Sequence, residues 1–499
     1  MNKYTFGLGS LLLLSLITSG CGDMKTPSDL LQAPSQGSSD GNLTGIVKSF
    51  LPANAHLTVP VQSESGSAIQ LHDLDQDGKD ELLAFYKTDT TDYEINTLLL
   101  SQQDGKWNKL ATLTGVGSEL NYVSFTDVTA DGTADLLLGY GGGEGLTREL
   151  AVYSLKDGTL NELLKQPYDQ LIVGDLTGEG TQDIAVLQGI YTTDTVRENH
   201  LQLLRLKGGT PQMLSDQKLD GNVIQFQFAK ASPSRSAIVV DAAIGAHAAY
   251  TSLLIWANGQ FADILATEDY QRASLAAGKA LVLAPPATEP DPPAPVPDTP
   301  LGSNSLAIKD YPLDSKDVNG DGITEIGFLV PPAGTGSLAP LATPFITKYY
   351  QWDGQSKLTL VQEQFDRWGF NFRFPKSWAG QTLLEIPEES PQPWEKIQFS
   401  YKNPESAVKA PLLELRLLTK KGWAAAEVQL KADKREYKLL YEQGNSMGDT
   451  EPTVFVAVMP PAGEADKLLQ GVDQQQYNQL KLTLDEVLQL AGTPQKSLP

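Results

Sequence analysis

One acidic phrase occurs four times in the chain, and it limits the possible folds more than any other sequence feature. Each copy has oxygen-bearing side chains at positions 1, 3, 5 and 9, glycine at position 6, and an apolar run from position 10. The copies begin at Asp73, Asp127, Asp175 and Asp317. Calcium is a hard cation that takes about six to eight oxygen ligands, and alternate positions of a tight loop can point to one centre. Because glycine permits the sharp turn, the phrase predicts four calcium-binding loops.

The candidate calcium ligands lie at equivalent positions of the four copies. They are Asp73, Asp75, Asp77, Lys79 and Glu81; Asp127, Thr129, Asp131 and Asp135; Asp175, Thr177, Glu179 and Asp183; and Asp317, Asn319, Asp321 and Glu325. The alternative is an acidic turn that binds nothing, because Asp, Asn and Gly also favour turns. The first and fourth copies favour the metal, whereas threonine at position 3 leaves both interpretations open in the second and third copies.

The residues after each phrase exclude an EF-hand. An EF-hand loop has a bidentate Glu at position 12 and continues into a helix. Here position 12 is Ala84, Leu138, Val186 or Phe328, within a short apolar run. Short apolar runs bounded by turn residues are typical of buried strands. The sequence therefore predicts that each loop joins two strands.

A second periodicity accompanies the first. Dipeptides typical of β-hairpin turns lie between apolar runs at 104–105, 157–158, 208–209, 258–259 and 353–354, in steps of 53, 51, 50 and 95 residues. The step of 95 residues is about twice the others, which predicts a worn hairpin, one that has lost its typical dipeptide, near 302–304. Worn loops without a full carboxylate set are expected near 229–236 and 272–283. A repeat of about 50 residues with four strands is typical of a β-propeller.

The predicted fold class is therefore mainly β. Residues 44–366 form a six- to seven-bladed propeller, in which the strand-like segment 45–62 leaves room for the seventh blade. The proline-rich segment 284–305 is interpreted as a solvent loop within it. Residues 367–499 contain further strand-like runs and a helical pattern over 463–491, which predicts a small α+β domain.

The repeated loops resemble those of FG-GAP and VCBS-type repeats, the calcium-binding repeats of integrin-α-like propellers. The resemblance rests on the Asp-x-Asp/Asn-x-Asp-Gly pattern before an apolar strand and covers about two-thirds of the chain. It implies structural Ca²⁺ in a loop between the first two strands of a blade, and a binding or adhesion role. The Phe-Gly and Gly-Ala-Pro elements of the FG-GAP family are not evident, so the subfamily stays open.

The first residues predict export and lipid anchoring. Lys3 precedes a short apolar stretch, small residues follow, and Cys21 is the only cysteine of the chain. This arrangement resembles the lipobox of bacterial lipoproteins, which implies a signal peptide over 1–21 and lipidation of Cys21. Residues 22–43 are polar and small, as expected of a flexible tether. The predicted location is the extracytoplasmic face of a bacterial cell membrane; an ordinary cleaved signal peptide is the alternative.

Charge excludes one class of partner. The chain has 38 basic and 61 acidic residues, a net charge of −23. Nucleic acid is not an expected partner, because affinity for nucleic acids comes from Lys and Arg neutralising phosphates. The acidic excess lies in the part that carries the repeats, as calcium loops require.

No catalytic constellation is evident in the sequence. The four histidines lie outside known metal-binding spacings, and no Gly-x-Ser-x-Gly elbow is present. We therefore favour a non-enzymatic scaffold that binds protein or polysaccharide and leave the question of an enzyme open. The alternative is a secreted polysaccharide- or peptide-acting hydrolase or lyase that uses the propeller as its scaffold.

Overall fold

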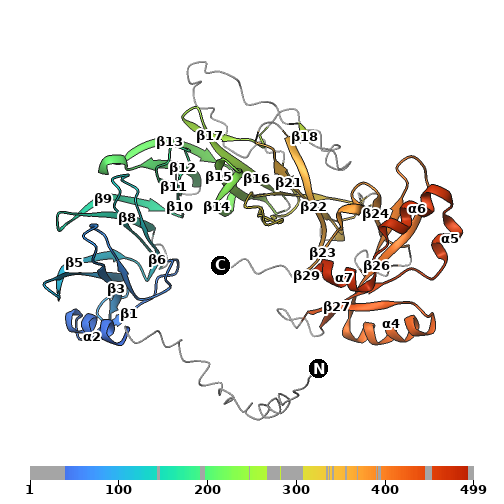
Figure 1. The fold of residues 1–499 in the computed structure, drawn as a ribbon, viewed down its shortest axis with the longest axis horizontal. Helices are drawn as coiled ribbons and strands as arrows, with labels where there is room; N and C mark the ends of the chain where they lie inside the picture. Colours follow the sequence, from blue (N-terminus) through green and yellow to red (C-terminus); the bar gives the residue numbers. More distant parts are fainter. Residues whose placement is uncertain are drawn as a thin grey trace, which may run out of the picture.

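The structure is a computed structural model. It describes residues 40–142, 147–191, 197–246, 248–266, 281–282, 307–332, 335, 338–339, 342–354, 357–367, 369–388, 390, 395–443 and 452–492. Within these ranges the chain is mainly β, with several antiparallel sheets and a few helices (Figure 1). Among the described residues, no helix is both long enough and apolar enough to cross a bilayer.

Five sheets are built as antiparallel meanders of four consecutive strands. The first sheet contains β2 (Ile69–His72), β3 (Glu81–Thr88), β4 (Glu94–Gln103) and β5 (Lys106–Val116), and the second contains β6 (Glu119–Thr126), β7 (Asp135–Gly141), β8 (Arg148–Lys156) and β9 (Thr159–Tyr168). The third sheet contains β10 (Gln170–Gly174), β11 (Asp183–Tyr191), β12 (Arg197–Arg205) and β13 (Gln212–Leu219), and the fourth contains β14 (Asn222–Ser232), β15 (Arg235–Gly245), β16 (Ala248–Ala257) and β17 (Gln260–Asp263). The fifth sheet contains β20 (Ile326–Val330), β21 (Ile346–Trp352), β22 (Lys357–Arg367) and β23 (Phe370–Arg373).

Short strands and one turn complete these sheets. β1 (Ala55–Leu57) pairs with β3, β19 (Ala307–Lys309) with β16, β18 (Leu281–Val282) with β22, and β29 (Ala491–Gly492) with β23. A 3-10 turn, η1 (Lys207–Gly209), joins β12 to β13.

The sixth sheet belongs to the C-terminal part. Its strands follow the order β24 (Thr382–Glu385), β25 (Lys396–Lys402), β26 (Lys409–Thr419), β28 (Thr453–Val458) and β27 (Tyr437–Gln443). The helices are η3 (Lys376–Trp378), α4 (Lys420–Ala432), α5 (Glu464–Leu468), α6 (Gly471–Leu480) and α7 (Leu484–Leu490). The predicted helical pattern over 463–491 is confirmed, because it matches α5 to α7.

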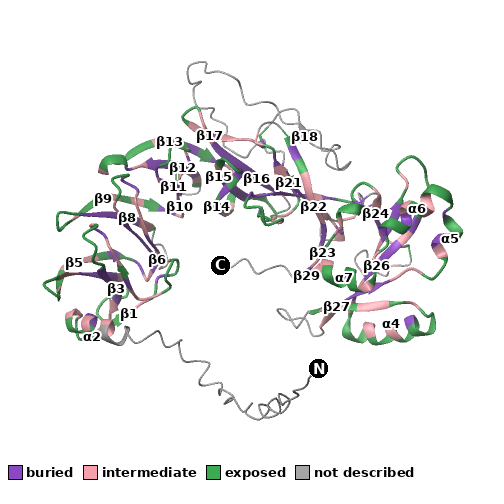
Figure 2. Ribbon diagram, viewed as in Figure 1, coloured by how far each residue is buried: buried purple, intermediate pink, exposed green. Residues whose placement is uncertain are grey.

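The second strand of each of the first four meanders has an apolar central run, because both faces of the strand are buried there. In β7, Leu136 and Leu138 pack toward the first sheet, whereas Leu137 packs toward the third. In β11, Ile184 packs toward the second sheet and Ala185 toward the fourth. Alternate side chains of a strand point to opposite faces. The core of the first five sheets is therefore a series of separate clusters, one between each pair of neighbouring sheets. Figure 2 shows the buried stretches of the strands in purple.

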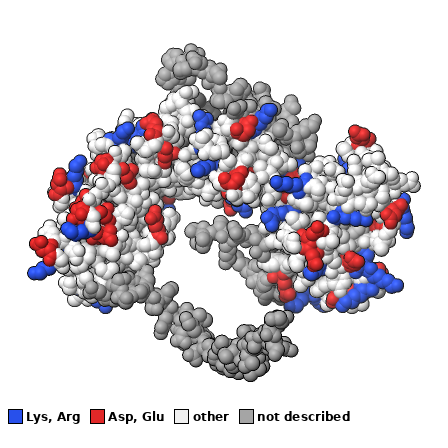
Figure 3. All heavy atoms as spheres, viewed as in Figure 1, with Lys and Arg blue, Asp and Glu red and all other residues white. Residues whose placement is uncertain are grey.

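The sheets follow one another along an arc. In Figure 1, β6, β10 and β14 lie on its inner side, and β9, β13 and β17 lie on its outer side. On the face drawn in Figure 3, acidic and basic side chains lie in small interspersed groups over the sheets, and several basic ones gather over α4.

A helix covers the outward face of the sheet at each end of the arc. α2 (Asp40–Phe50) places Val47 against Leu82, Ala84 and Leu98 of the first sheet. α4 places Leu430 against the valines of β28 on the far side of the sixth sheet. Neither covered face is open to a further sheet in this structure.

The predicted turns are confirmed. Four of the five predicted hairpin dipeptides lie between the third and fourth strands of a meander, and Asp353-Gly354 lies between β21 and β22, the second and third strands of the fifth meander. Asp104-Gly105, Asp157-Gly158 and Asn258-Gly259 have positive φ at both residues, as a type I′ turn requires. The worn loop predicted near 229–236 is a tight connection between β14 and β15.

Other predictions need correction. The strand-like segment 45–62 begins as helix α2, so it supplies no seventh blade, and this helix also takes in residues 40–43 of the predicted tether. Leu43, Ile46 and Val47 show helical spacing, which explains the difference. The strand over 370–373, predicted in the C-terminal part, pairs with β22 of the fifth sheet. The worn loop near 272–283 lies mostly, and the hairpin near 302–304 wholly, outside the described residues, as do residues 1–39 with Cys21.

Candidate metal loops

The four acidic loops have one backbone plan. Three of them join the first and second strands of a meander, and the fourth is closed by a bridge between Lys316 and Glu325 ahead of β20. Position 6 has positive φ in every copy: +82° at Gly78, +93° at Gly132, +77° at Gly180 and +82° at Gly322. Position 4 also has positive φ in every copy, at residues that include Gln76 and Ala130. The glycine at position 6 is therefore required by the backbone.

Two carboxylates hold each loop through its own backbone. The residue at position 1 accepts a hydrogen bond from the amide of position 6; in the first loop, Gly78 N donates to Asp73 Oδ2 at 3.1 Å. The residue at position 9 accepts from the start of the loop; Leu74 N donates to Glu81 Oε2 at 2.9 Å. The fourth loop repeats both contacts with Asp317 and Glu325. Part of the acidic pattern thus serves turn formation.

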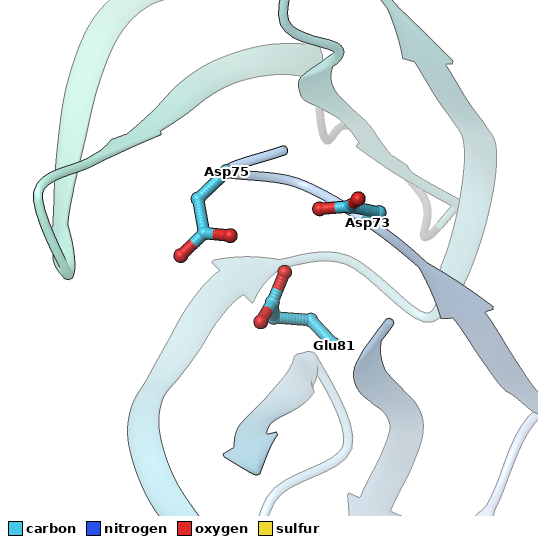
Figure 4. A group of neighbouring side chains, drawn as sticks. All are labelled: Asp73, Asp75 and Glu81. Atoms are coloured by element: carbon cyan, nitrogen blue, oxygen red, sulfur yellow. The ribbon is translucent and has the colours of Figure 1, made fainter. Parts of the chain in front are cut away.

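The first loop gathers three carboxylates around one point. Oxygen atoms of Asp73, Asp75 and Glu81 all lie within 4.8 Å of one another (Figure 4). Asp73 Oδ1 is buried and has no hydrogen-bond partner in the described part of the chain. Burial, together with the three neighbouring aspartates, raises the pKa of Glu81 to about 7. Asp77 faces Lys79 instead, which contacts it through both its amide and its ammonium group. A cation would relieve the repulsion among these carboxylates.

The fourth loop gathers a similar set, supplemented by amides. Asp317, Asp321 and Glu325 have carboxylate oxygens within 4.8 Å of one another. The amide nitrogens of Asn319 and Gln351 donate to Asp321 Oδ2 and Glu325 Oε1, at 2.8 to 3.2 Å. Burial and the charges of the two aspartates raise the pKa of Glu325 to about 7. Each amide also carries an oxygen, a ligand type that calcium accepts.

The second and third loops differ from these two. Within the described residues, neither brings three carboxylates to a common point. In the second loop, Asp131 accepts from the amide of Thr133, and Thr129 Oγ1 contacts Asp127 at 3.4 Å. Asp135 is fully buried, and its Oδ1 atom has no hydrogen-bond partner among the described residues.

An arginine occupies the centre of the third loop. Arg205, at the end of β12, donates from Nε to Asp183 Oδ1 at 3.0 Å and from Nη1 to Glu179 Oε2 at 2.9 Å. Its Nη2 donates to Thr177 Oγ1 at 2.7 Å. These three acceptors are predicted calcium ligands of the third loop, and Asp175 is instead bound by loop amides. A guanidinium therefore stands where the sequence predicts a metal ion.

Strand register makes Arg205 equivalent to a residue in each of the other loops. Ile184 pairs with Leu204, so position 9 of the third loop lies opposite Arg205. The corresponding residues are Ser101 on β4, Ser154 on β8 and Gln351 on β21. This set was missed by sequence reasoning, although each member stands two or three residues before a hairpin dipeptide and could have been found by counting back.

The residues present fit calcium at the first and fourth loops. The donors are carboxylates and amides, which supply the oxygen ligands of a hard cation. The orphaned Asp73 Oδ1 and the guanidinium at the equivalent point of the third loop independently indicate that this point accepts positive charge.

Comparisons with known proteins add no family. No family model matches the chain, and no curated protein matches it. Three solved structures each align with 71% of the chain: a protein from Lactobacillus plantarum (10% identity, TM-score 0.25, 86% of that chain covered), rhamnogalacturonan lyase YesW (12%, 0.28, 76%) and a rhamnogalacturonan lyase from Bacillus licheniformis (11%, 0.23, 73%). TM-scores this low support no statement on the fold or the function of the chain.

Proposed function

We propose that this protein is a lipid-anchored component of the bacterial cell surface, whose calcium-stabilised row of sheets binds a protein or polysaccharide ligand. One observation carries the calcium assignment: the point where the first and fourth loops gather three carboxylates is filled by Arg205 in the third. The lipobox-like sequence ending at Cys21 supports the anchor.

The proposed calcium ions are structural. Asp73, Asp75 and Glu81 would hold one ion, and Asp317, Asp321 and Glu325 the other, with Asn319 and Gln351 beside it. Bound calcium would neutralise buried carboxylates that otherwise repel one another. Extracellular calcium modules bind at roughly 10⁻⁴–10⁻³ M, so the sites would fill outside the cell.

We further propose that the sheets are propeller-type blades. Four-stranded meanders, with first strands on the inner side of an arc and sheets packed face to face, support this assignment (Figure 1). Six or seven blades in a closed ring stay a prediction, because residues 267–280 and 283–306 lie outside the described part. In a closed ring, the faces of the first and last sheets that α2 and α4 cover would instead pack against other sheets.

Thermal unfolding in calcium and in excess chelator tests the calcium assignment. Each filled site should stabilise the fold by about 1.4 kcal/mol at a tenfold excess of calcium over Kd. Asp73→Ala and Asp317→Ala should each remove part of the calcium effect, and the double variant nearly all of it. Glu64→Ala removes an exposed carboxylate outside the loops and should leave the effect intact.

Affinity capture from intact envelopes, with and without chelator, tests the binding role. A specific partner in calcium is the expected result. The absence of a partner in both conditions would remove the support for a scaffold. In the thermal unfolding experiment, identical melting curves in calcium and in chelator would show that the loops are only turns.

A further inference from the structure

A polar cavity of about 460 Å³ lies where the second, third and fourth sheets meet. Its walls come from β6, β10 and β14, the first strands of these sheets, and from residues that start β8 and β12. The first strands lie on the inner side of the arc (Figure 1). The volume is in the range of small-molecule sites.

Two arginines enter this cavity from equivalent places in neighbouring sheets. Arg148 begins β8 and Arg197 begins β12, so each opens the third strand of its meander. Each side chain lies over a glycine of the second strand. A Cβ at Gly141 would approach Arg148 Cγ to 2.9 Å, and a Cβ at Gly189 would approach Arg197 Nε to 2.0 Å. Both arginines therefore depend on the missing side chain beneath them.

A single aspartate fixes both arginines. Asp169 lies between β9 and β10, where the chain passes from the second sheet to the third. Its carbonyl oxygen accepts a hydrogen bond from Arg148 Nη1 at 2.8 Å, and its Oδ2 forms an ion pair with Arg197 Nη2. The amide of Gly189 also donates to Oδ2 at 2.6 Å. The two guanidinium groups are thus held in place before any ligand arrives.

The cavity carries positive charge in an acidic protein. Its charged lining residues are Arg148, Arg197 and Asp169, which sum to +1, whereas the chain as a whole has a charge of −23. A guanidinium has five N–H donors. Each of the two arginines donates one side-chain hydrogen bond to the described residues. Each guanidinium therefore keeps further N–H groups that can bind an anion.

The remaining lining suits a polyhydroxylated molecule. Tyr122, Ile224 and Phe226 supply apolar and aromatic surface, and Ile224 is 48% exposed. Gln62 and Gln170 add amides, which pair with hydroxyl groups as donors and acceptors. Arginine with an aromatic wall and several amides matches a sugar ring that bears a carboxylate, which arginine binds through two parallel hydrogen bonds.

We propose that this cavity is a binding site for a uronic-acid-bearing glycan, with Arg148 and Arg197 receiving the carboxylate. The inference rests on the proposed binding role and names its ligand class. Its residues are separate from the calcium loops, so the two can be tested independently.

Isothermal titration of the full chain in detergent, at fixed free calcium, tests the site. The probes are a galacturonate trimer and its fully methyl-esterified counterpart, in which each carboxylate is replaced by an uncharged methyl ester. The acid should bind at least tenfold more tightly than the ester. Arg148→Gln should weaken binding of the acid at least tenfold. Arg235→Gln, at an exposed arginine that begins β15, should leave it unchanged.

A second variant protects the test against misfolding. Ile224→Trp places bulk in the cavity at an exposed position without altering charge, and it should also abolish binding. Equal affinity for acid and ester, or equal weakening by Arg148→Gln and Arg235→Gln, would overturn the proposal. Competition by inorganic phosphate as strong as by monomeric galacturonate would also overturn it, in favour of a general anion site. Envelope capture without trimer binding would refute only this cavity, because the scaffold proposal would stand.

Discussion

Arg205 shows how one side chain can change the chemistry of a repeated loop. It is 13% exposed and pairs with Asp183, whose side chain is fully buried. The ion-pair geometry gives the third loop a permanent cation, so this loop should be folded at any calcium concentration. Ser101 and Gln351 hold the equivalent places in the first and fourth loops, where they leave the carboxylates to be neutralised by another group.

Replacing Arg205 with glutamine should expose this role. Removing one partner of a buried ion pair costs about 3–5 kcal/mol, so Arg205→Gln should lose that much stability in chelator. Calcium should recover part of the loss, because Asp183, Glu179 and Thr177 again face an open centre. Urea unfolding with and without calcium measures both effects, with Arg235→Gln as the control. A variant as stable as the parent in chelator would contradict the assignment.

Asp263 is a second residue whose environment predicts a measurable property. Its carboxylate accepts hydrogen bonds from the Ser252 hydroxyl and from the amides of Leu253 and Leu265. Burial outweighs these bonds and raises its pKa to about 6.

The raised pKa of Asp263 predicts pH-dependent stability. The unfolded carboxyl has a pKa of about 3.9, so between roughly pH 4 and pH 6 the folded state binds more protons than the unfolded state. Its contribution should therefore fall as pH rises through this window, by up to about 3 kcal/mol, and then level off. Asp263→Asn keeps the shape and removes the titration. The difference in unfolding free energy between parent and variant, measured across this window, should follow this curve; a flat difference would contradict it.

At the scale of elements, local chemistry made the loops and hairpins predictable. Residues such as Asp104-Gly105 specify a type I′ turn by their own backbone preferences, and the acidic phrase specifies the turn that leads into an apolar strand. The two carboxylate clusters at 73–81 and 317–325 could also be predicted, because their members are close in sequence. Arg205 could not be seen this way, since it lies 22 residues from Asp183 and reaches it across a strand pair.

Helix α2 was mispredicted because its apolar residues were interpreted without their spacing. Leu43, Ile46, Val47 and Phe50 form one face, which packs on the first sheet. Similarly, α4 carries a short polar and alanine-rich pattern around Leu430 that gives little local signal. Both helices are fixed by the sheet faces they cover, which sequence reasoning did not place.

A charge introduced under α2 should disturb the end of the arc. Val47→Asp buries a carboxylate against Leu82 and Leu98 without a partner, which should cost at least about 3 kcal/mol and release the helix. The exposed apolar face should then promote self-association, seen by sedimentation velocity. Gly45→Asp adds the same group to the same helix where a Cβ meets nothing within 4 Å, and it should remain monomeric and stable. Identical behaviour of both variants would show that α2 does not cover the sheet.

At the scale of the whole molecule, stability is distributed along the row of sheets. Each neighbouring pair shares its own apolar cluster, as in repeat proteins, whose stability is a sum of local and nearest-neighbour contributions. The proposed calcium sites lie in the first and fifth sheets, whereas the third sheet has Arg205.

Chelation should therefore loosen the molecule unevenly. Hydrogen exchange should accelerate in β2–β3 and β20–β21 when calcium is removed, and β10–β11 should keep its protection because its loop contains a guanidinium. Mass spectrometry of peptides from the same digest provides the internal comparison. Uniform acceleration across all sheets would contradict this distribution.

Helices α2 and α4, which cover the sheets at the two ends, affect how the number of repeated sheets in such a chain could change in evolution. In a closed ring, an additional blade must alter the angle between all the others. In this structure the terminal sheets rest against α2 and α4 instead of against each other. Duplication of one internal unit would then lengthen the row while α2 and α4 keep their contacts with the terminal sheets.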